Sequence, residues 1–564
     1  MRNSQLLIMN KFALVIVFSI SILSCLAQGT SKSLEISDFD NLLDNKPKLV
    51  VGIVVDQMRY DYLTRFADKF GEGGFNRLIS GGFNCKNSHF NYIPTYTGPG
   101  HSSIYTGTTP KYHGVISNNW YDKVSKKSVY CTSDDSVQSI GTTTTAGQMS
   151  PHRMLASTFL DENRLFTQGR GKSVGISMKD RGAILPAGHS ANSAYWFHGS
   201  DAGHMISSSY YMDTLPMWVH RFNGSDAVEK HLTEWNTLRD IITYEESGTD
   251  ENNFEGGFRG KELATFPYDL KTLAPQNGGF DILRSTPFGN TIVTDFAIEA
   301  IEGEKLGRDV YTDVLAISYS STDYIGHNFG VNSKEVQDTY LRLDLELERL
   351  LNALDSKIGK GQYTVFLTSD HGAVNVPAYL KSAHIPAGYL DNNAMRQNFN
   401  LFMSKTFGAT DLVENVSNNQ VFLNREKIAL LGLDLDDVQE AIVNEIITYE
   451  HIDKAYSAST MSSSAFNEGI ESMLQNGFNQ KRSGDVLVVH EPAMISYSRT
   501  GSTHGSGRNY DTHVPLIFYG NGINQGSTFK RTEIIDIAPT MSALLGISFP
   551  NAATGEPLID VLKN

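Results

Sequence analysis

Cysteine is scarce in this chain of 564 residues, which contains three: Cys25, Cys85 and Cys131. A zinc site in such a chain has to be built from histidine and carboxylate rather than from thiolate ligands. The 16 histidines and 62 acidic residues supply those ligands in excess. In an exported protein Cys85 and Cys131 can pair as a disulfide, and they can equally remain two buried thiols.

Positive charge is also in short supply. There are 47 Lys and Arg residues against 62 Asp and Glu, which gives a formal net charge of −15. A nucleic-acid-binding surface needs a basic excess, so we expect no nucleic acid as a dedicated partner. Hydrophobic residues make up 40% of the chain and charged residues 19%, a globular composition that excludes a wholly disordered, collagenous or coiled-coil protein.

A hydrophobic run long enough to cross a membrane is missing from the amino-terminal segment. Residues 12–23 form an apolar run of 12 residues, preceded by Arg2 and Lys11 and by no acid. This pattern is typical of a signal peptide. We predict cleavage after Ala27, and hence a periplasmic or secreted protein with no transmembrane segment in its mature chain. Lipid attachment at Cys25, which follows a poor lipobox, is the alternative.

The remainder of the chain alternates between strand and helix patterns. We expect a polar arm at 28–47 and a single domain at 48–564. Near-continuous apolar runs predict buried parallel strands, and a helical stripe of apolar residues predicts a helix over 333–358. The expected fold is therefore α/β, a sandwich with a central mostly parallel sheet and helices on both faces. The predicted strands lie at 48–55, 313–319, 363–369 and 514–520, and insertions are expected at about 190–290 and 373–500.

Acidic and histidine residues follow three of these predicted strands, and His504 lies in a Gly/Ser-rich loop at 499–507. Ligands of open α/β sheets gather beyond the carboxyl ends of the strands, so these side chains are expected to meet at one edge. Three carboxylates and three imidazoles exceed the needs of one tetrahedral ion and suffice for two zinc ions with open positions. Each motif alone is weak evidence for a metal site, but their occurrence together indicates a metal centre. The residues are Asp56, Asp323, His327, Asp370, His371 and His504.

A threonine precedes another predicted helix, in the sequence Thr97-Gly-Pro-Gly-His101. Pro99 suits the first turn of a helix, which places Thr97 at a helix N-terminus, where backbone N–H groups favour an anion. A plain helix cap is the simpler role for Thr97. Beside a divalent cation, its hydroxyl could instead lose its proton and attack a substrate.

Taken together, these motifs resemble the alkaline phosphatase superfamily, in order and in spacing over nearly the whole mature chain. The similarity is strongest to the PafA-type, phosphate-irrepressible alkaline phosphatases of flavobacteria. The segment from Tyr105-Thr106-Gly107 to His113-Gly114 adds to the match. The resemblance implies an alkaline-phosphatase-like fold and hydrolysis of a broad range of phosphate monoesters through a phosphothreonine intermediate. The oligomeric state is not indicated.

The resemblance also implies roles for individual residues. Thr97 would be the nucleophile, and Asn118, Lys179 and Arg181 would contact the phosphate. Lysine and arginine aimed at the third phosphate oxygen favour a monoester dianion over a diester. His101 and His113 are expected to support the nucleophile loop by hydrogen bonding. The first zinc would be bound by Asp323, His327 and His504, and the second by Asp56, Thr97, Asp370 and His371.

Three other functions are compatible with parts of this pattern. A phosphodiesterase or nucleotide pyrophosphatase would use the same core with an apolar pocket in place of the Lys179 and Arg181 contacts. A sulfatase needs Cys or Ser where this chain has Met149, in Met149-Ser-Pro-His-Arg153. A non-catalytic binding protein would tolerate loss of a metal ligand, and no expected ligand is missing. We therefore expect a monoesterase, with the phosphodiesterase as the alternative.

Overall fold

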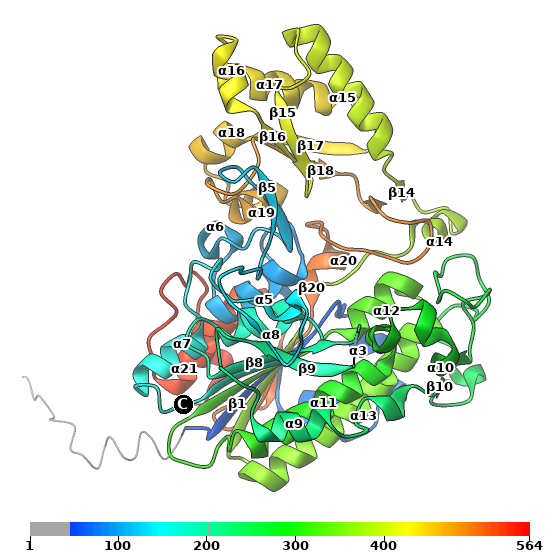
Figure 1. Ribbon diagram of the computed structural model, residues 1–564, viewed down its shortest axis with the longest axis vertical. Helices are drawn as coiled ribbons and strands as arrows, with labels where there is room; N and C mark the ends of the chain where they lie inside the picture. Colours follow the sequence, from blue (N-terminus) through cyan, green and yellow to red (C-terminus); the bar gives the residue numbers. More distant parts are fainter. Residues whose placement is uncertain (1–45, 201, 564) are drawn as a thin grey trace, which may run out of the picture. The chain divides into compact units, whose positions relative to one another are not determined.

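The fold is organised around one large sheet (Figure 1). The computed structural model describes residues 46–200 and 202–563; the predicted signal peptide, the candidate lipidation site and most of the arm lie outside the described residues. Ten strands form the sheet, in the order β22-β2-β21-β13-β1-β12-β7-β8-β9-β6. The strands at its centre are β13 (Tyr363–Thr368), β1 (Leu49–Val55), β12 (Asp313–Tyr319), β7 (Ser173–Ser177) and β8 (Ser193–His198), and they run parallel.

The sheet is mostly parallel, as predicted, but one strand on either side of its centre runs in the opposite direction. The strand predicted at 514–520 is β21 (Leu516–Gly520), which pairs with β13 in the antiparallel sense. On the other side, β9 (His204–Ser208) runs antiparallel to β8. Both β8 and β9 fall inside the stretch at 190–290 that we expected to be an insertion. The chain therefore leaves the central sheet only after Ser208.

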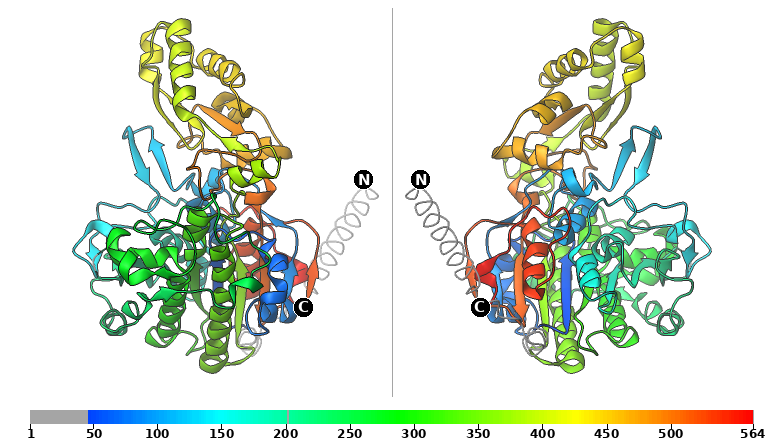
Figure 2. Two further views of the ribbon diagram at one scale, coloured as in Figure 1. Left: turned by 90° about the vertical axis from the view of Figure 1, so that its right-hand side faces the viewer. Right: turned by 90° about the vertical axis from the view of Figure 1, so that its left-hand side faces the viewer.

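Helices cover both faces of the sheet, which explains the near-continuous apolar strands. In β1, Val51 and Ile53 pack into one core with the helices α11 (Pro287–Gly303) and α13 (Lys334–Leu354). Val50 and Val54 face the opposite side and pack with α5 (Thr97–Thr106) and α21 (Ile537–Leu545). Successive residues of a strand point to opposite faces, so a strand covered on both sides is apolar at every position. The two layers of helices are visible in Figure 2.

Two helices begin with different capping arrangements. The Ser333 hydroxyl accepts a hydrogen bond from the Val336 N–H at 3.1 Å, as expected of an N-cap. Asp536 makes no such bond to its own helix. Its two carboxylate oxygens accept instead from the N–H groups of Glu533 at 2.8 Å and Glu556 at 2.9 Å. Asp536 thus connects the start of α21 to the carboxyl-terminal segment through hydrogen bonds.

The stretch predicted as an insertion at 373–500 contains a small sheet with its own core. The strands β15 (Val413–Ser417), β16 (Gln420–Leu423), β18 (Val486–His490) and β17 (Ile452–Ser457) form it, in that order. Two helices, α15 (Asn392–Phe407) and α17 (Leu435–Ile446), contribute buried side chains to the same core. This unit lies at the upper end of the molecule in Figure 1, beyond α5 and α20 (Asn509–Thr512).

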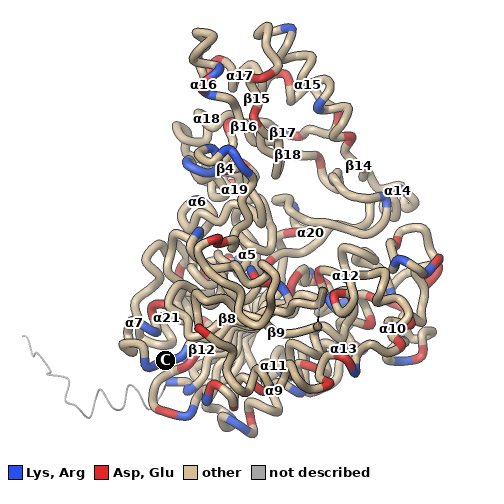
Figure 3. The backbone as a smooth tube through the Cα atoms, in the orientation of Figure 1, with Lys and Arg blue, Asp and Glu red and all other residues tan. Residues whose placement is uncertain are grey.

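Charged residues of both signs are interspersed over the described part of the chain, and one group of basic residues stands out near β4 (Asn119–Asp122) and β5 (Lys127–Tyr130) (Figure 3). In that hairpin, Lys126 forms ion pairs with Glu414 at 3.1 Å and Glu426 at 3.4 Å, both from the inserted unit. The basic group therefore contacts an acidic neighbour.

Two further expectations concern cysteines and membranes. Cys85 and Cys131 are both buried and unpaired, so the structure contains two buried thiols here rather than a disulfide. Among the described residues, no helix combines the length and the apolar character needed to cross a bilayer.

The helix α5 is pressed against the end of β13, and a glycine permits this approach. A Cβ atom on Gly100 would lie 2.3 Å from the backbone oxygen of Asp370. Real side chains do not approach backbone so closely, so even a methyl group would force α5 and the Asp370 loop apart. The distance between Thr97 and Asp370 thus depends on this glycine.

We expect Gly100→Ala to lower the melting temperature, because overpacking of this kind costs about 1–3 kcal/mol, more than the helix propensity gained from alanine. Gly248→Ala is a suitable control, since its Cβ would meet Asn332 at an ordinary 3.5 Å. The two variants are compared by thermal unfolding at one scan rate. Equal melting temperatures would contradict the close packing of α5.

Candidate metal centre and nucleophile

The predicted ligands meet at the carboxyl ends of three adjacent parallel strands. Asp56 follows β1, and Asp370 and His371 follow β13. β12 leads into α12 (Ser321–Phe329), whose first and last turns carry Asp323 and His327. Because Val55 is paired with Tyr319 in register, the three strands end at the same edge. The convergence predicted from the sequence is therefore present in the structure.

One group of candidate ligands consists of Asp323, His327 and His504, whose ligand atoms all lie within 4.8 Å of one another. The Nε2 atoms of His327 and His504 lie 3.3 and 3.6 Å from Asp323 Oδ1. Both imidazoles are held through Nδ1, which lies 2.7 Å from the carbonyl oxygen of Ser502 in one case and of Thr95 in the other. A carbonyl accepts only, so each Nδ1 is protonated and each Nε2 presents its lone pair to a metal.

The second group overlaps the first. Asp56, Asp323 and His371 offer ligand atoms within the same 4.8 Å limit. His371 Nε2 lies 3.5 Å from Asp56 Oδ1 and 3.5 Å from Asp370 Oδ2. Asp323, which we expected only at the first metal, thus lies within reach of both positions.

Two buried carboxylate oxygens in this group, Asp56 Oδ1 and Asp370 Oδ2, have no hydrogen-bond donor. Unsatisfied anionic oxygens beside neutral imidazoles are a donor set that suits a divalent cation such as zinc. The residues present therefore fit a metal pair.

Burial and mutual repulsion dominate the electrostatics of these carboxylates. Burial, together with Asp323 and Asp370, raises the pKa of Asp56 well above its ordinary value. Burial also acts to raise the pKa of Asp323, but His327 and Lys179 outweigh it and hold that pKa well below the ordinary range. The pKa of His504 is lowered by burial and by the nearby His371, which keeps this imidazole neutral as a metal ligand must be.

Lys179 lies inside the carboxylate group rather than beside it. Its Nζ atom donates to Asp56 Oδ2 at 2.7 Å and to Asp323 Oδ2 at 2.5 Å. Burial acts to lower the pKa of this amine, but Asp323 and Asp56 reverse the effect and raise it. The amine is therefore a fixed positive charge at the centre of the site.

The candidate nucleophile occupies the first residue of α5, as predicted. Thr97 is buried, and its hydroxyl oxygen lies 3.5 Å from His371 Nε2. The side-chain oxygen of Asn118 accepts from the Gly98 N–H at 2.7 Å, so its amide N–H₂ is left available for a substrate oxygen. Thr97, Asn118 and the metal ligands thus surround one point at the N-terminus of α5, where the helix dipole favours an anion.

Arg181 is held by side chains that the sequence did not point to. Its Nη1 donates to the Tyr130 hydroxyl at 3.0 Å. Tyr130 and Thr132 in turn donate to Asp180, at 2.7 and 2.8 Å. For Asp180 the sequence offered a clue to this role, because the residue stands between Lys179 and Arg181. The positions of Tyr130 and Thr132 in the chain offered no such clue.

Gln57 is the other functional residue missed from the sequence. It directly follows Asp56 and has a left-handed backbone with φ of 64°. Its backbone N–H donates to Asp370 Oδ1 at 3.2 Å, and its side-chain amide donates to Asp323 Oδ1 at 2.8 Å. Gln57 thus orients two candidate ligands from other segments of the chain, Asp323 of α12 and Asp370 after β13.

Two histidines support the nucleophile helix. His101 Nδ1 lies 2.9 Å from the Thr97 carbonyl oxygen and its Nε2 lies 2.9 Å from the Ser318 hydroxyl. His113 Nε2 contacts the Ser103 hydroxyl, also at 2.9 Å. These bonds tie α5 to β12 and to the following turn.

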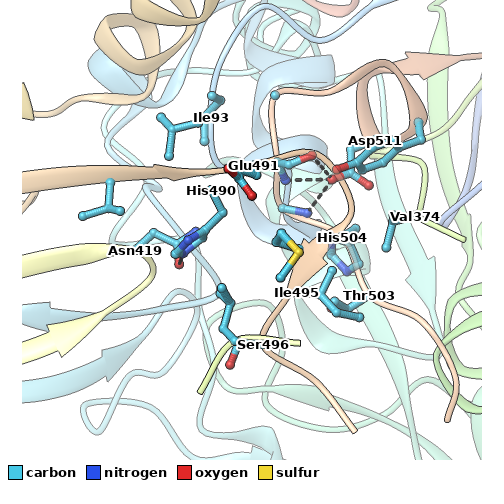
Figure 4. A pocket seen from close by; sticks show the side chains of 18 of the residues that line it. Ile93, Val374, Asn419, His490, Glu491, Ile495, Ser496, Thr503, His504 and Asp511 are labelled. Carbon is cyan, nitrogen blue, oxygen red and sulfur yellow. Dashed lines mark hydrogen bonds between the residues drawn. The ribbon is translucent and has the colours of Figure 1, made fainter. Parts of the chain in front are cut away.

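A cavity of about 110 Å³ borders the first ligand group. Figure 4 shows His504 on one side of it, and His490, Glu491 and Asn419 of the inserted unit on another. The inserted unit therefore contributes to the surroundings of a candidate metal ligand.

Comparison with known proteins gives matches over most of the chain. A model of the type I phosphodiesterase/nucleotide pyrophosphatase family matches residues 50–514. Alkaline phosphatase PafA of Elizabethkingia meningoseptica is 44% identical over 522 residues, which cover 92% of this chain and 95% of PafA. Alkaline phosphatase PhoV of Synechococcus elongatus is 41% identical over 519 residues, with 92% and 93% covered.

The structural comparison agrees with these sequence matches. The crystal structure of wild-type PafA superposes on the structure with a TM-score of 0.88 at 43% identity, covering 92% of this chain and 99% of the other. The fold expected from the sequence is thereby confirmed. With a family model that spans the metal ligands and relatives that match nearly end to end, the chain belongs to the type I phosphodiesterase/nucleotide pyrophosphatase family of the alkaline phosphatase superfamily.

Proposed function

We propose that this protein is an exported phosphatase that hydrolyses phosphate monoesters of small molecules at a two-zinc site, through a phosphothreonine formed on Thr97. The observation that carries the proposal is the position of the Thr97 hydroxyl, 3.5 Å from His371 Nε2 at the meeting point of two groups of metal-binding side chains. The leader at residues 1–27, with its short apolar run and two basic residues, supports export.

The relatives support this reading. PafA and PhoV are both named alkaline phosphatases, and membership of the family makes a hydrolase the expected class. A further similar crystal structure is of a PafA variant with substitutions at one threonine, one asparagine, one lysine and one arginine. These are the four residue types that we assign here to the nucleophile and the phosphate contacts.

In the proposed site, Asp323, His327 and His504 hold one zinc ion, and Asp56, Asp370, His371 and Thr97 hold the other. Zinc ions bound there would stabilise negative charge on the attacking and leaving oxygens. Asp323 is close enough to both groups to influence either ion. Gln57 keeps Asp323 and Asp370 in orientation through its two hydrogen bonds.

The reaction on this chain's own residues has two displacements. The Thr97 oxygen, having lost its proton, attacks phosphorus, and the P–O bond to the alcohol breaks with its electron pair on the departing oxygen, which takes up a proton. Water then attacks the phosphothreonine, and the P–O bond to Thr97 breaks, which returns the threonine and releases inorganic phosphate. Overall, one water molecule supplies a proton to the alcohol and a hydroxyl group to the phosphate.

The three non-bridging oxygens need donors. The side-chain oxygen of Asn118 is bound by the Gly98 N–H, so the N–H₂ group of the same amide is available to one of them. Arg181 offers a planar pair of N–H groups, and its contact with Tyr130 restricts the orientation of that plane. Lys179 supplies a fixed positive charge between the carboxylates. A dianionic monoester gains more from these charges than a diester does.

The alternative is a phosphodiesterase or nucleotide pyrophosphatase, and the description of the matching family favours it. Both activities use the same metals and nucleophile, so turnover of an aryl monoester and of its methyl diester separates them. Faster turnover of the diester would contradict our choice.

Replacing Thr97 with alanine should reduce monoester hydrolysis by about 1,000-fold or more, as when other nucleophiles are removed, while the other proposed ligands of the second zinc, Asp56, Asp370 and His371, remain. Steady-state turnover and metal analysis of one sample measure both effects, with zinc expected near two ions per chain as in the parent. Thr106→Ala, at the far end of the same helix, is the matched control. Full activity of Thr97→Ala would rule out the nucleophile.

The variant Arg181→Ala should lower kcat/KM for a monoester by about 10- to 100-fold, because a charged hydrogen bond contributes about 1.5–3 kcal/mol. The loss for a diester should be smaller, since a diester lacks the second negative charge. The exposed Arg170→Ala serves as a control for loss of positive charge. Equal losses for the two substrates would refute the dianion argument.

Removal of metal by a chelator should abolish activity, and zinc should restore it. Asp323→Asn is expected to lower zinc content at both positions, because this carboxylate lies within reach of both groups. Elemental analysis and activity are followed together. Undiminished turnover in a sample shown to be free of metal would disprove the zinc-dependent mechanism.

A further inference from the structure

An exposed tyrosine of the inserted stretch lies against a candidate ligand of the first metal. The ring of Tyr497 stacks on the imidazole of His327, with ring centroids 5.6 Å apart and ring planes inclined by 29°. The Tyr497 hydroxyl donates to the carbonyl oxygen of His327 at 3.3 Å. The residue is nevertheless 41% exposed, and within residues 46–200 and 202–563 no other ring and no lysine or arginine packs on it. One face of the ring is therefore open to a ligand.

The backbone that carries Tyr497 is held on both sides. Before it, β19 (Met494–Ile495) pairs with β14 (Gly388–Tyr389). After it, the Ser502 N–H donates to the His327 carbonyl oxygen at 3.2 Å, so this carbonyl is bound from both ends of the segment. A ring that is already fixed loses little conformational entropy when a ligand packs on it, which favours a binding role for Tyr497.

Tyr497 borders the side of the site from which the alcohol would depart. The Thr97 hydroxyl oxygen lies 3.5 Å from His371 Nε2, in the second ligand group. In an in-line displacement the departing oxygen lies opposite the attacking oxygen, and in a two-metal site the two oxygens lie at different metal positions. The alcohol therefore faces the first ligand group, which contains His327, and the ring of Tyr497 lies beside it.

We propose that Tyr497 is a specificity-determining residue that stacks on the alcohol part of the substrate, so that this protein favours phosphate monoesters with a flat aromatic ring close to the ester oxygen. The inference rests on the proposed phosphatase function. The ring makes the contact rather than the hydroxyl, because the hydroxyl is already bonded to His327. An aromatic pair gains binding energy beyond the burial of apolar area, and a saturated ring lacks this gain.

Three monoesters whose alcohols have similar basicity separate this contact from chemical reactivity: benzyl, cyclohexylmethyl and ethyl phosphate. For the zinc-loaded protein we expect the highest kcat/KM with benzyl phosphate. Tyr497→Leu should lower this value by about two- to tenfold more than the values for the other two esters. Tyr497→Phe, which lacks only the hydroxyl, should keep the preference. Tyr210→Leu is the matched control, because Tyr210 is also exposed and its hydroxyl donates to the carbonyl of another histidine, His189.

Equilibrium binding tests the same contact without catalysis. In 2-phenylethylphosphonate and 2-cyclohexylethylphosphonate a carbon replaces the ester oxygen, so neither compound is hydrolysed. Calorimetry on the zinc-loaded protein should give a Kd about two- to tenfold lower for the phenyl compound. Tyr497→Leu should remove this difference, and Tyr497→Phe should retain it.

Equal losses for the three esters in Tyr497→Leu would show that the residue only positions His327, and the inference would be overturned. Equal affinity of the parent protein for the two phosphonates would overturn it as well, even if phosphate monoesters are hydrolysed. A parent protein that hydrolyses none of the three esters would instead contradict the proposed function. The phosphonate affinities would then decide the role of Tyr497 by themselves.

Discussion

Three carboxylates buried side by side are the constraint around which this protein is built. Asp56, Asp323 and Asp370 repel one another in a region from which water is excluded, and such an arrangement is unfavourable without compensating positive charge. Lys179 provides one permanent charge through its bonds to two of them. Imidazoles held by backbone carbonyls would complete the coordination of the proposed metal ions. The segments that contact the site stabilise this close arrangement of three carboxylates and one amine.

The sheet determines where the carboxylates meet, and the helices determine how closely. Parallel pairing of β1 with β12 and β13 brings three strand ends to one edge. The missing side chain of Gly100 allows α5 to reach the Asp370 backbone, so the Thr97 hydroxyl is placed beside His371. His101 fixes the same helix to Ser318, at the end of β12. The proposed nucleophile is thereby positioned by packing of a helix against the sheet.

Much of this arrangement could be predicted from the sequence, because buried strands and metal ligands have strong local patterns. The central strands, the helix α13 and the convergence of the candidate metal ligands followed from apolar periodicity and from acids at strand ends. The direction of β21 did not, since an apolar run is the same in both directions. Tyr130 and Gln57 were missed for another reason. Their roles depend on contacts with residues distant in the chain, such as Arg181 and Asp370, and no local pattern records such contacts.

The separation of these residues along the chain has a consequence for biosynthesis. The hydrogen bond from Gln57 to Asp370 joins positions 313 residues apart, and His504 comes from still further on. Contacts of such long range form late, because the entropy of closing large loops must be overcome first. A nascent chain therefore carries its acidic strand ends exposed and separate until nearly all of it has been made. Binding of the proposed metal ions, which would require all of these residues at once, would thus mark the completion of folding.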